Sequence, residues 1–411
     1  MYELTVCRGC GSRNLEELLN LGKSPIANNF LIYEKIDMPE VVYPLILMCC
    51  AECAFVQLSQ KLPENILFND TYLYFSSYST SWLEHSKIFA QDMKARLKLD
   101  SRSLVLEIAS NDGYLLDFFK AMGISTLGIE PSRNVAEIAI QKGVKTEVEF
   151  FTKHLAKQLK DRGVVPDLIV ANNVLAHVPD IHDFISGIAE LVTLKTVVSI
   201  EFPHLVNLMR HNQFDTIYHE HYSYLSITSL EAILDKYGLK IFDLEELDTH
   251  GGSLRLYIDS TSSSRLVTKA VKKTRALESI YDPRDIANKK ALQENVLRVR
   301  EELILEIRTI KQAGQKIALY GAAAKGNTLL NFCGVSSSDI EYAVDANPNK
   351  QNRFLPGTHI AVYGPEKLQT DPVDVVLILP WNLGSEINSQ LREIIEYPFV
   401  TFRAIPKIEY Y

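Results

Sequence analysis

The sequence predicts an α/β protein with a small metal-binding module at its N-terminus and two α/β domains of parallel strands after it. Three observations support this fold class. Short apolar runs alternate with segments of helical spacing in the middle of the chain, and they do so again in its last third. Two C-x-x-C pairs precede both regions. With 411 residues, the chain is long enough for two or three domains that each bury a core.

Composition and charge give no indication of a nucleic-acid or membrane partner. The net charge is −8 at pH 7 and 46% of the residues are hydrophobic, which is ordinary for a globular protein. Neither value gives a reason to expect nucleic acid or an anionic membrane as a partner. The sequence opens with no signal-peptide pattern and contains no apolar run long enough to cross a bilayer. We therefore expect a cytoplasmic protein.

Four of the six cysteines form the two pairs, Cys7/Cys10 and Cys50/Cys53. In a reducing compartment this spacing is typical of a Cys₄ zinc site in which each pair lies on a tight turn between strands. Four thiolates leave no open coordination position, so the zinc is expected to stabilise the module and to take no part in chemistry. Cys49 could replace Cys50 in a C-x-x-x-C pair, although the two-residue spacer is favoured.

The first α/β unit begins with a buried-strand pattern at 104–109. A tight turn at 110–113 and apolar residues at helical spacing follow it, and a second strand pattern ends at Glu130. A carboxylate at the tip of the second strand can accept hydrogen bonds from both hydroxyls of a ribose, and the turn lets the backbone approach a ligand closely. The unit is therefore predicted to bind a nucleoside.

The turn distinguishes between two nucleoside cofactors. A dinucleotide site uses G-x-G-x-x-G, because its pyrophosphate lies on bare backbone at a helix N-terminus. Here the turn has a single glycine, Gly113, and a carboxylate, Glu107, precedes it. Negative charge would repel a pyrophosphate but suits the sulfonium and ammonium groups of S-adenosylmethionine, which we favour over NAD. The alternative is an ordinary β-α-β unit with a surface turn, and Glu130 at the expected offset weighs against it.

Two more buried-strand patterns end in polar residues. The first is followed by Asn172, Asn173 and His177, and the second ends at Glu201. Ligands of open α/β sheets lie beyond the carboxyl ends of the strands, so these side chains are expected near the two carboxylates above. The predicted cofactor site comprises Glu107, Ala109, Ser110, Asn111, Asp112, Gly113, Glu130, Asn172 and Asn173.

The segment 214–224 is expected to carry the reaction. It contains two histidines, two acids and three tyrosines, more than a surface loop requires. His219, Glu220 and His221 could be metal ligands, but neighbours one and two apart do not converge on a helix and alternate faces on a strand. Acid–base chemistry is favoured, because histidine titrates near neutral pH and a tyrosine can donate to an oxyanion.

Two glycine-containing turns come later in the chain. The run at 250–255 leads into an apolar strand and by itself predicts a hairpin turn. After a Ser/Thr-rich linker at 260–264 and a long helical stretch at 292–312, a second α/β unit has the turn 321–328. Small residues with Lys325 at the start of a helix predict either a phosphate cradle or close packing of a helix on a sheet.

The order and spacing of these motifs are more informative than any one of them. The set comprises the four cysteines, Y-x-Y-x-S-S at 72–77, S-N-D-G at 110–113, E-H at 220–221, H-G-G-S-x-R at 250–255 and G-A-x-A-K-G at 321–326. Together they resemble the S-adenosylmethionine-dependent sugar C-methyltransferases, which methylate C3 of nucleotide-linked 4-keto-6-deoxyhexoses. The resemblance covers essentially the whole chain.

The resemblance implies a zinc-binding domain over 1–70, a Rossmann-like class I methyltransferase domain over 71–260 and a Rossmann-like α/β domain over 261–411 that binds the sugar nucleotide. The active site would lie between the last two domains. The implied catalytic residues are His221 as the base, Tyr218, Glu220 as an orienting or charge-stabilising acid, His177 and one tyrosine of the pair Tyr72 and Tyr74, of which Tyr74 is preferred. The implied substrate-binding residues are Tyr72, Ser76, Ser77, Glu201, His250, Gly251, Gly252, Arg255, Gly321, Ala324, Lys325 and Asn327.

The leading hypothesis is therefore 3-C-methylation of a nucleotide diphosphate-linked 4-keto-6-deoxysugar, with a structural zinc. Two alternatives stay open at this point: an O- or N-methyltransferase of small molecules on the same scaffold, and a zinc-ribbon adaptor with a degenerate methyltransferase domain. One departure from the family is Ala109, where most methyltransferases of this general fold have glycine. A monomer or a weak homo-oligomer is expected.

Overall fold

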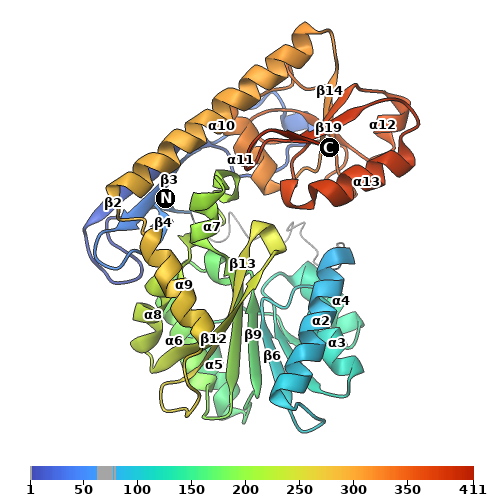
Figure 1. Ribbon diagram of the computed structural model, residues 1–411. Coiled ribbons are helices and arrows are strands. Elements are labelled where there is room, and N and C mark those ends of the chain that lie inside the picture. Colours follow the sequence, from blue (N-terminus) through green and yellow to red (C-terminus); the bar gives the residue numbers. More distant parts are fainter. Residues whose placement is uncertain (1, 63–76, 78–79) are drawn as a thin grey trace.

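The computed structural model describes residues 2–62, 77 and 80–411. Tyr72, Tyr74 and Ser76, which the resemblance places around the substrate, lie outside the described residues, and Ser77 is half-buried. A small N-terminal module, a central α/β domain and a C-terminal α/β domain lie along the long helix α10, Ile286–Gln312 (Figure 1). None of the described helices combines the length and the hydropathy needed to cross a membrane.

Seven described strands form the central sheet in the order β12-β13-β10-β9-β6-β7-β8. Their bounds are β6 Leu104–Ile108, β7 Ser125–Ile129, β8 Thr146–Glu147, β9 Leu168–Asn172, β10 Val197–Pro203, β12 Leu239–Leu247 and β13 Ser253–Ser260. Only β13 runs antiparallel to its neighbours, β10 and β12. The carboxyl ends of β6, β7, β9 and β10 therefore meet at one edge, as the sequence predicts.

Helices cover both faces of the central sheet (Figure 1). On one face lie α2 Thr80–Leu97, α3 Tyr114–Ala121 and α4 Arg133–Gln141. On the other lie α5 Lys153–Asp161, α6 Ile181–Leu191, α8 Ile227–Asp235 and α9 Lys269–Ile280. Short helical segments are η3 Leu175–His177, α7 Leu205–Arg210, η4 Phe214–Thr216 and η5 Thr249–Gly251. Because α9 packs on β12 and α8, it covers the central sheet although it follows residue 261.

The N-terminal module is a four-stranded antiparallel sheet in the order β11-β4-β3-β2. The bounds are β2 Leu15–Ser24, β3 Tyr43–Cys50, β4 Val56–Leu58 and β11 Ser223–Tyr224, with β1 Tyr2–Glu3 paired to β5 Gln60–Lys61 and a short helix η1 Tyr33–Lys35. Its edge strand β11 comes from the middle of the chain, because Ser223 pairs with Gln57 and Tyr224 with Val56. The residues directly after His221 thus belong to the N-terminal sheet.

The C-terminal domain has a second mostly parallel sheet, in the order β16-β17-β15-β14-β18-β19-β20. The strands are β14 Ile317–Tyr320, β15 Tyr342–Val344, β16 Arg353–Phe354, β17 Ala361–Tyr363, β18 Val375–Ile378, β19 Val400–Arg403 and β20 Glu409–Tyr410. The helices are α11 Ala324–Cys333, α12 Lys367–Thr370, η6 Trp381–Leu383 and α13 Gly384–Ile394. The β14–α11–β15 unit is the second α/β unit that the sequence predicts.

Helix α10 connects the three parts by packing against β2, α7, α11 and β14. Its buried residues, three or four apart, are Leu292, Val296, Val299, Leu303, Ile307 and Ile310. This spacing places them on one face of the helix. The helix begins earlier than the predicted residue 292, because the Asp285 carboxylate caps it by accepting hydrogen bonds from the amides of Ala287 and Asn288.

Candidate active site

The four predicted cysteines lie together in the N-terminal module. All four Sγ atoms lie within 4.8 Å of one another, with 3.6 Å between Cys7 and Cys53 and between Cys10 and Cys50. A tetrahedral zinc with Zn–S bonds of about 2.3 Å separates its sulfurs by about 3.8 Å, so the cluster fits zinc. Cys49 instead points into the apolar core. Cys50 is therefore the fourth member of the set.

In the turn after β6, three residues have a left-handed backbone conformation. Ala109, Asn111 and Gly113 have φ values of 56°, 50° and 77°. A Cβ on Gly113 would lie 3.0 Å from that of Ala139, so glycine is needed there for both conformation and space. At Ala109 the methyl group is tolerated at a conformation that glycine adopts more easily.

Glu130 holds this turn from the end of β7. Its two carboxylate oxygens accept hydrogen bonds from the amides of Asn111, at 3.0 Å, and Ser132, at 2.8 Å. Each oxygen keeps a second lone pair, which leaves the carboxylate able to accept from a ribose hydroxyl. Close by, a Cβ on Gly128 would lie 2.4 Å from Ser110 Oγ, so the glycine makes room for the Ser110 side chain.

The carboxylate of Glu107 is 1% exposed at the end of β6. Burial raises its pKa well above the usual value, and the nearby Glu130 and Asp112 raise it further. Within residues 2–62, 77 and 80–411, Glu107 Oε2 finds no hydrogen-bond partner. A cationic ligand would relieve both conditions, which fits the ammonium or sulfonium of S-adenosylmethionine. Asp112 is paired through one oxygen, because its Oδ2 lies 3.4 Å from Lys142 Nζ, while its Oδ1 is buried with no partner among the described residues.

His221 is held as one tautomer. Its Nδ1 lies 3.0 Å from the carbonyl oxygen of Thr216, which can only accept, so Nδ1 carries the proton. Nε2 is therefore the basic atom, and it accepts a hydrogen bond from the Tyr218 hydroxyl at 2.7 Å. Burial lowers the pKa of His221 well below its usual value, and nearby His177 lowers it further. The imidazole is neutral at physiological pH.

His177 and Glu220 flank this imidazole. The rings of His177 and His221 meet edge to face with centroids 4.6 Å apart, and burial lowers the pKa of His177 to about 4. Glu220 is 2% exposed and accepts a hydrogen bond from Asn28 of the N-terminal module at 3.0 Å. The orienting contact expected of Glu220 is made instead by the Thr216 carbonyl, and burial raises the pKa of Glu220.

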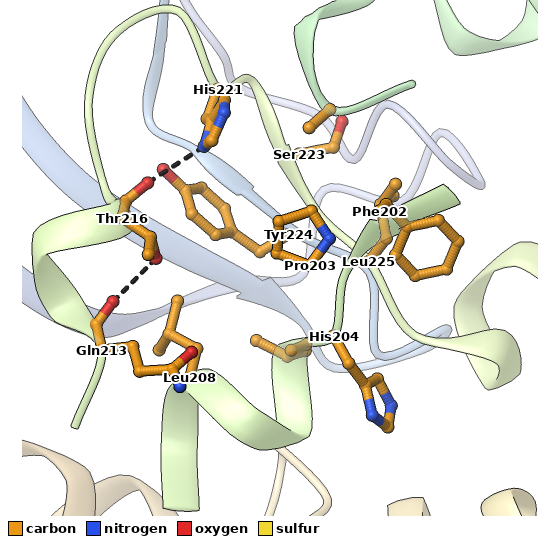
Figure 2. A pocket seen from close by; sticks show the side chains of 12 residues that line it. Phe202, Pro203, His204, Leu208, Gln213, Thr216, His221, Ser223, Tyr224 and Leu225 are labelled. Atoms are coloured by element: carbon orange, nitrogen blue, oxygen red, sulfur yellow. Dashed lines mark hydrogen bonds between the residues drawn. The ribbon is translucent and has the colours of Figure 1, made fainter. Parts of the chain in front are cut away.

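A small cavity of about 20 Å³ lies beside His221, lined by Thr216, Ser223, Tyr224 and apolar residues. Figure 2 shows the Tyr224 phenol extending toward Thr216 and His221 from the opposite wall. The volume suffices for about one water molecule and not for a sugar. The cavity is therefore too small to hold the substrate as it stands.

The H-G-G turn at 250–252 is more than a simple hairpin turn, because other elements pack closely against it. His250, Gly251 and Gly252 all have positive φ, at 55°, 87° and 116°. A Cβ on Gly251 would lie 2.2 Å from Trp381 Cη2, and one on Gly252 would lie 2.3 Å from Asn207 Nδ2. His250 Nε2 lies 3.3 Å from Asn173 Nδ2, so the turn contacts the predicted cofactor side of the sheet.

Glu201 and Arg255 form a buried ion pair beneath this turn, with 2.9 Å between Arg255 Nη2 and Glu201 Oε2. His85 lies within hydrogen-bond distance of both, and Thr249 donates to Glu201 Oε1. Neighbouring Arg255 and His85 lower the pKa of Glu201 despite its burial. Because protein groups occupy both oxygens of Glu201, the structure gives this pair a supporting position and not the substrate contact that we expected.

The C-terminal turn faces the H-G-G turn across the domain interface. Lys325 Nζ lies 3.4 Å from the carbonyl oxygen of His250 and 5.1 Å from the ring centroid of Trp381. Gly321 has a φ of 88° and is closed in by Pro380, which a Cβ would meet at 2.5 Å, while Ala324 starts α11. The structure thus brings Lys325 to the domain interface, while Gly326 packs closely on Leu379 of the sheet side, so both features expected of this turn are present.

Asn327 is turned away from this interface. Its Nδ2 lies 3.4 Å from the carbonyl oxygen of Ala27, and its Oδ1 accepts from Asn331. It is 1% exposed and joins α11 to the N-terminal module. The substrate-binding role of Asn327 stays a prediction, and in this structure its side chain contacts Ala27 and Asn331 instead.

Sequence reasoning assigned no role to Asp215. This residue is fully buried and accepts a hydrogen bond from Trp381 Nε1 at 2.6 Å. Burial raises the pKa of Asp215 to about 6, while Lys325 opposes the shift. An acid within an apolar stretch, Phe214-Asp215-Thr216-Ile217, was the available signal. The contact fixes Trp381 between Lys325 and the H-G-G turn.

Three protein-family profiles match the chain: a zinc binding domain over 7–68, a methyltransferase domain over 82–244 and a C-methyltransferase C-terminal domain over 248–406. C-methyltransferase NovU of Streptomyces niveus is 31% identical over 390 residues, covering 95% of this chain and 93% of NovU.

Solved structures of methyltransferases match part of the chain. An S-adenosylmethionine-dependent methyltransferase of Anabaena variabilis shares 12% identity over 42% of this chain and 84% of its own, with a TM-score of 0.35. Magnesium protoporphyrin IX methyltransferase of Synechocystis PCC 6803 shares 18% identity over 42% and 78%, with a TM-score of 0.31.

The matched profiles and the clustered cysteines define an S-adenosylmethionine-dependent methyltransferase with a zinc-binding module. The 31% identity with NovU, which extends over nearly all of both chains, specifies the kind of methyltransferase. The protein belongs to the C-methyltransferase family that includes NovU. This assignment favours an enzyme over the zinc-ribbon adaptor.

Proposed function

We propose that this enzyme methylates C3 of a nucleotide diphosphate-linked 4-keto-6-deoxyhexose, in the formation of a branched deoxysugar. The observation that supports the proposal most is the neutral His221, whose Nε2 is a basic atom in a buried pocket. A carbon atom is a poor nucleophile until a proton beside a carbonyl group is removed from it. A positioned base is therefore the device that C-methylation needs.

In this proposal His221 and Tyr218 divide the work. His221 Nε2 takes the proton from C3, and Nδ1 keeps its hydrogen bond to the Thr216 carbonyl as the imidazolium forms. The Tyr218 hydroxyl, which donates to Nε2 in the free enzyme, donates to the C4 oxygen and stabilises the enolate. A positioned base contributes on the order of 10²–10⁴-fold, and an oxyanion donor about 10²–10³-fold.

S-adenosylmethionine supplies an activated methyl group bound to a sulfonium, which leaves as the neutral thioether. Glu107 and Glu130 are the carboxylates that would hold its cationic and ribose ends, beside Asn172 and Asn173. Attack in line with the sulfonium places base and donor on opposite faces of the enolate. The proposal therefore predicts inversion at C3.

The nucleotide would lie against the C-terminal turn. Lys325 offers a positive charge at the domain interface, next to the H-G-G turn that contacts Asn173. This arrangement gives a continuous path of polar groups from the cofactor side of the central sheet to the C-terminal domain. A diphosphate beside Lys325 would place the sugar between His221 and the cofactor. Thymidine diphosphate is the nucleotide that family resemblance suggests.

Mass spectrometry of incubations with S-adenosylmethionine and a panel of nucleotide 4-keto-6-deoxyhexoses tests the proposal. The expected product gains one methylene, and a substrate deuterated at C3 loses its label to solvent. The matched control is the same nucleotide sugar reduced to the 4-hydroxyl form, whose C3 proton is not acidic; it should not be methylated. A methylated product that retains the C3 deuterium would instead identify an O- or N-methyltransferase.

A further inference from the structure

Arg8, which lies between Cys7 and Cys10, reaches out of the cysteine cluster into the central domain. Its guanidinium donates to the carbonyl oxygen of Val178, at 3.3 Å, and to the hydroxyl of Ser223. Val178 directly follows His177, and Ser223 lies two residues after His221. One side chain therefore contacts the segments that carry both active-site histidines.

The guanidinium is held in place from both sides. Its centre lies 5.8 Å from the ring centroid of Phe55 and 5.6 Å from that of Tyr222, within the range of cation–π contacts. The buried Nε and Nη1 atoms of Arg8 have no acceptor in the described parts of the chain, so the two donated bonds, both from Nη2, fix its position. Because both bonds come from one nitrogen, a lysine Nζ can replace them in part, while the planar contact with the two rings is lost.

The backbone of Arg8 is tied to the same strand pairing. Its amide donates to Gln57 Oε1 at 2.8 Å, and Gln57 is the residue that pairs with Ser223 between β4 and β11. The amide of Leu58 donates to the carbonyl oxygen of Tyr222 at 3.1 Å. The first cysteine pair is thus tied, through Gln57, to the strand pair that holds the end of the His221 segment.

The cysteine turn is also fastened on its other side. The carbonyl oxygen of Gly9 lies 2.8 Å from His182 Nε2 and 3.2 Å from Lys236 Nζ. These two contacts dock the turn on the central domain through residues other than those that Arg8 contacts. A substitution at Lys236 is therefore a control: it leaves the four cysteines unchanged and weakens the docking of the turn without touching the contacts of Arg8.

We propose that Arg8 is a positioning residue: it links the rigid zinc-binding turn to the segments that hold the imidazoles of His177 and His221. The catalytic importance of His221 rests on the proposed function. Metal at Cys7 and Cys10 would fix the backbone on both sides of Arg8, so the zinc site would set the geometry of the two imidazoles as well as the stability of the module. Supporting residues of this kind typically change activity by about 10–100-fold.

The test compares Arg8→Met and Arg8→Lys with the control Lys236→Met. In the full-length zinc-loaded enzyme, we expect kcat to fall by about 10–100-fold for Arg8→Met and less for Arg8→Lys, with KM and S-adenosylmethionine affinity within about threefold. The control should keep kcat within about threefold. Zinc content and melting temperature are measured on each variant, so that loss of folding is separated from loss of positioning.

A second readout needs no substrate. In protein labelled with ¹⁵N-histidine, the ring nitrogens of His177 and His221 should shift in both Arg8 variants and not in Lys236→Met. Unchanged ring signals together with unchanged kcat in a folded Arg8→Met variant would overturn the proposal, as would an equal loss in the control. If the wild-type enzyme methylates no ketosugar but the ring signals still depend on Arg8, the positioning role stands and the proposed function fails.

Discussion

Replacing His221 by asparagine separates the role of this residue as a base from its role as a loop contact. The Nδ2 amide of asparagine can reach the Thr216 carbonyl, which accepts from the imidazole at 3.0 Å, while no basic atom replaces Nε2. We expect kcat to fall by about 10²–10⁴-fold, the usual contribution of a positioned base. At 1.36 kcal/mol for each tenfold change, this corresponds to about 3–5 kcal/mol of activation free energy.

Two assays measure this loss. Mass spectrometry follows the methylated product, and calorimetry should show S-adenosylmethionine affinity within about twofold of the wild type. With S-adenosylhomocysteine bound in D₂O, wild-type enzyme should exchange the C3 proton of the ketosugar, and the variant should not. His219→Gln is the matched control, because His219 is a buried histidine of the same segment whose ring contacts Tyr43.

The pH profile adds a second check. Burial and nearby His177 lower the pKa of His221 well below 6.5, so the imidazole is in its basic form throughout the neutral range. The acid limb of kcat/KM should therefore fall only below pH 6.5, as pH drops through the lowered value. An acid limb at or above pH 6.5 that disappears in the variant, or a kcat within threefold of wild type, would refute the reasoning.

Three further predictions concern stability. Changing Cys7 and Cys10 to serine should remove about one equivalent of zinc and lower the melting temperature, because the cluster loses half of its ligands. Gly251→Ala should cost roughly 2 kcal/mol or more in chemical denaturation, since its φ is 87° and the new Cβ would lie 2.2 Å from an indole carbon. His219→Gln should remove part of the acid sensitivity: burial lowers the pKa of His219 from 6.5 to about 4, so folding loses about 3 kcal/mol between those pH values.

Each of these has its own control. A folded and fully active double serine variant without metal would contradict the structural role of zinc. Gly314→Ala is the control for Gly251, because Gly314 has a φ of 76° but open space around its Cβ position, and should cost about 1 kcal/mol. For His219, the sign follows from its lowered pKa: the stability is fully present above pH 6.5 and lost on acidification. A variant with unchanged acid sensitivity between pH 6.5 and 4 would contradict it.

The elements that the sequence predicted correctly are those set by local pattern. The strand–turn–helix–strand unit ending at Glu130 and the second unit beginning at β14 both follow from short-range periodicity, since parallel strands buried on both faces are continuous apolar runs. The beginning of α10 was missed because the apolar spacing starts after its N-cap, Asp285.

The site was predictable in part. The motifs place His221, Tyr218 and Lys325 in the segments where the structure has them, but not their partners. That Glu220 contacts Asn28, that Arg255 pairs with Glu201, and that Trp381 donates to Asp215 are long-range contacts between elements up to 192 residues apart. No local pattern encodes which of several buried polar groups will meet.

By itself, then, the sequence determined the α/β class, the two C-x-x-C pairs of the N-terminal module and the acidic turn after the first strand of the central domain, because each depends on residues a few positions apart and on the chemistry of their side chains. Only the tertiary structure decided that Cys50 and not Cys49 completes the cluster, that β11 joins the N-terminal sheet, and that Asn327 faces the interior. These outcomes depend on how whole elements pack, and packing assigns each side chain to a face that its neighbours in the chain do not specify.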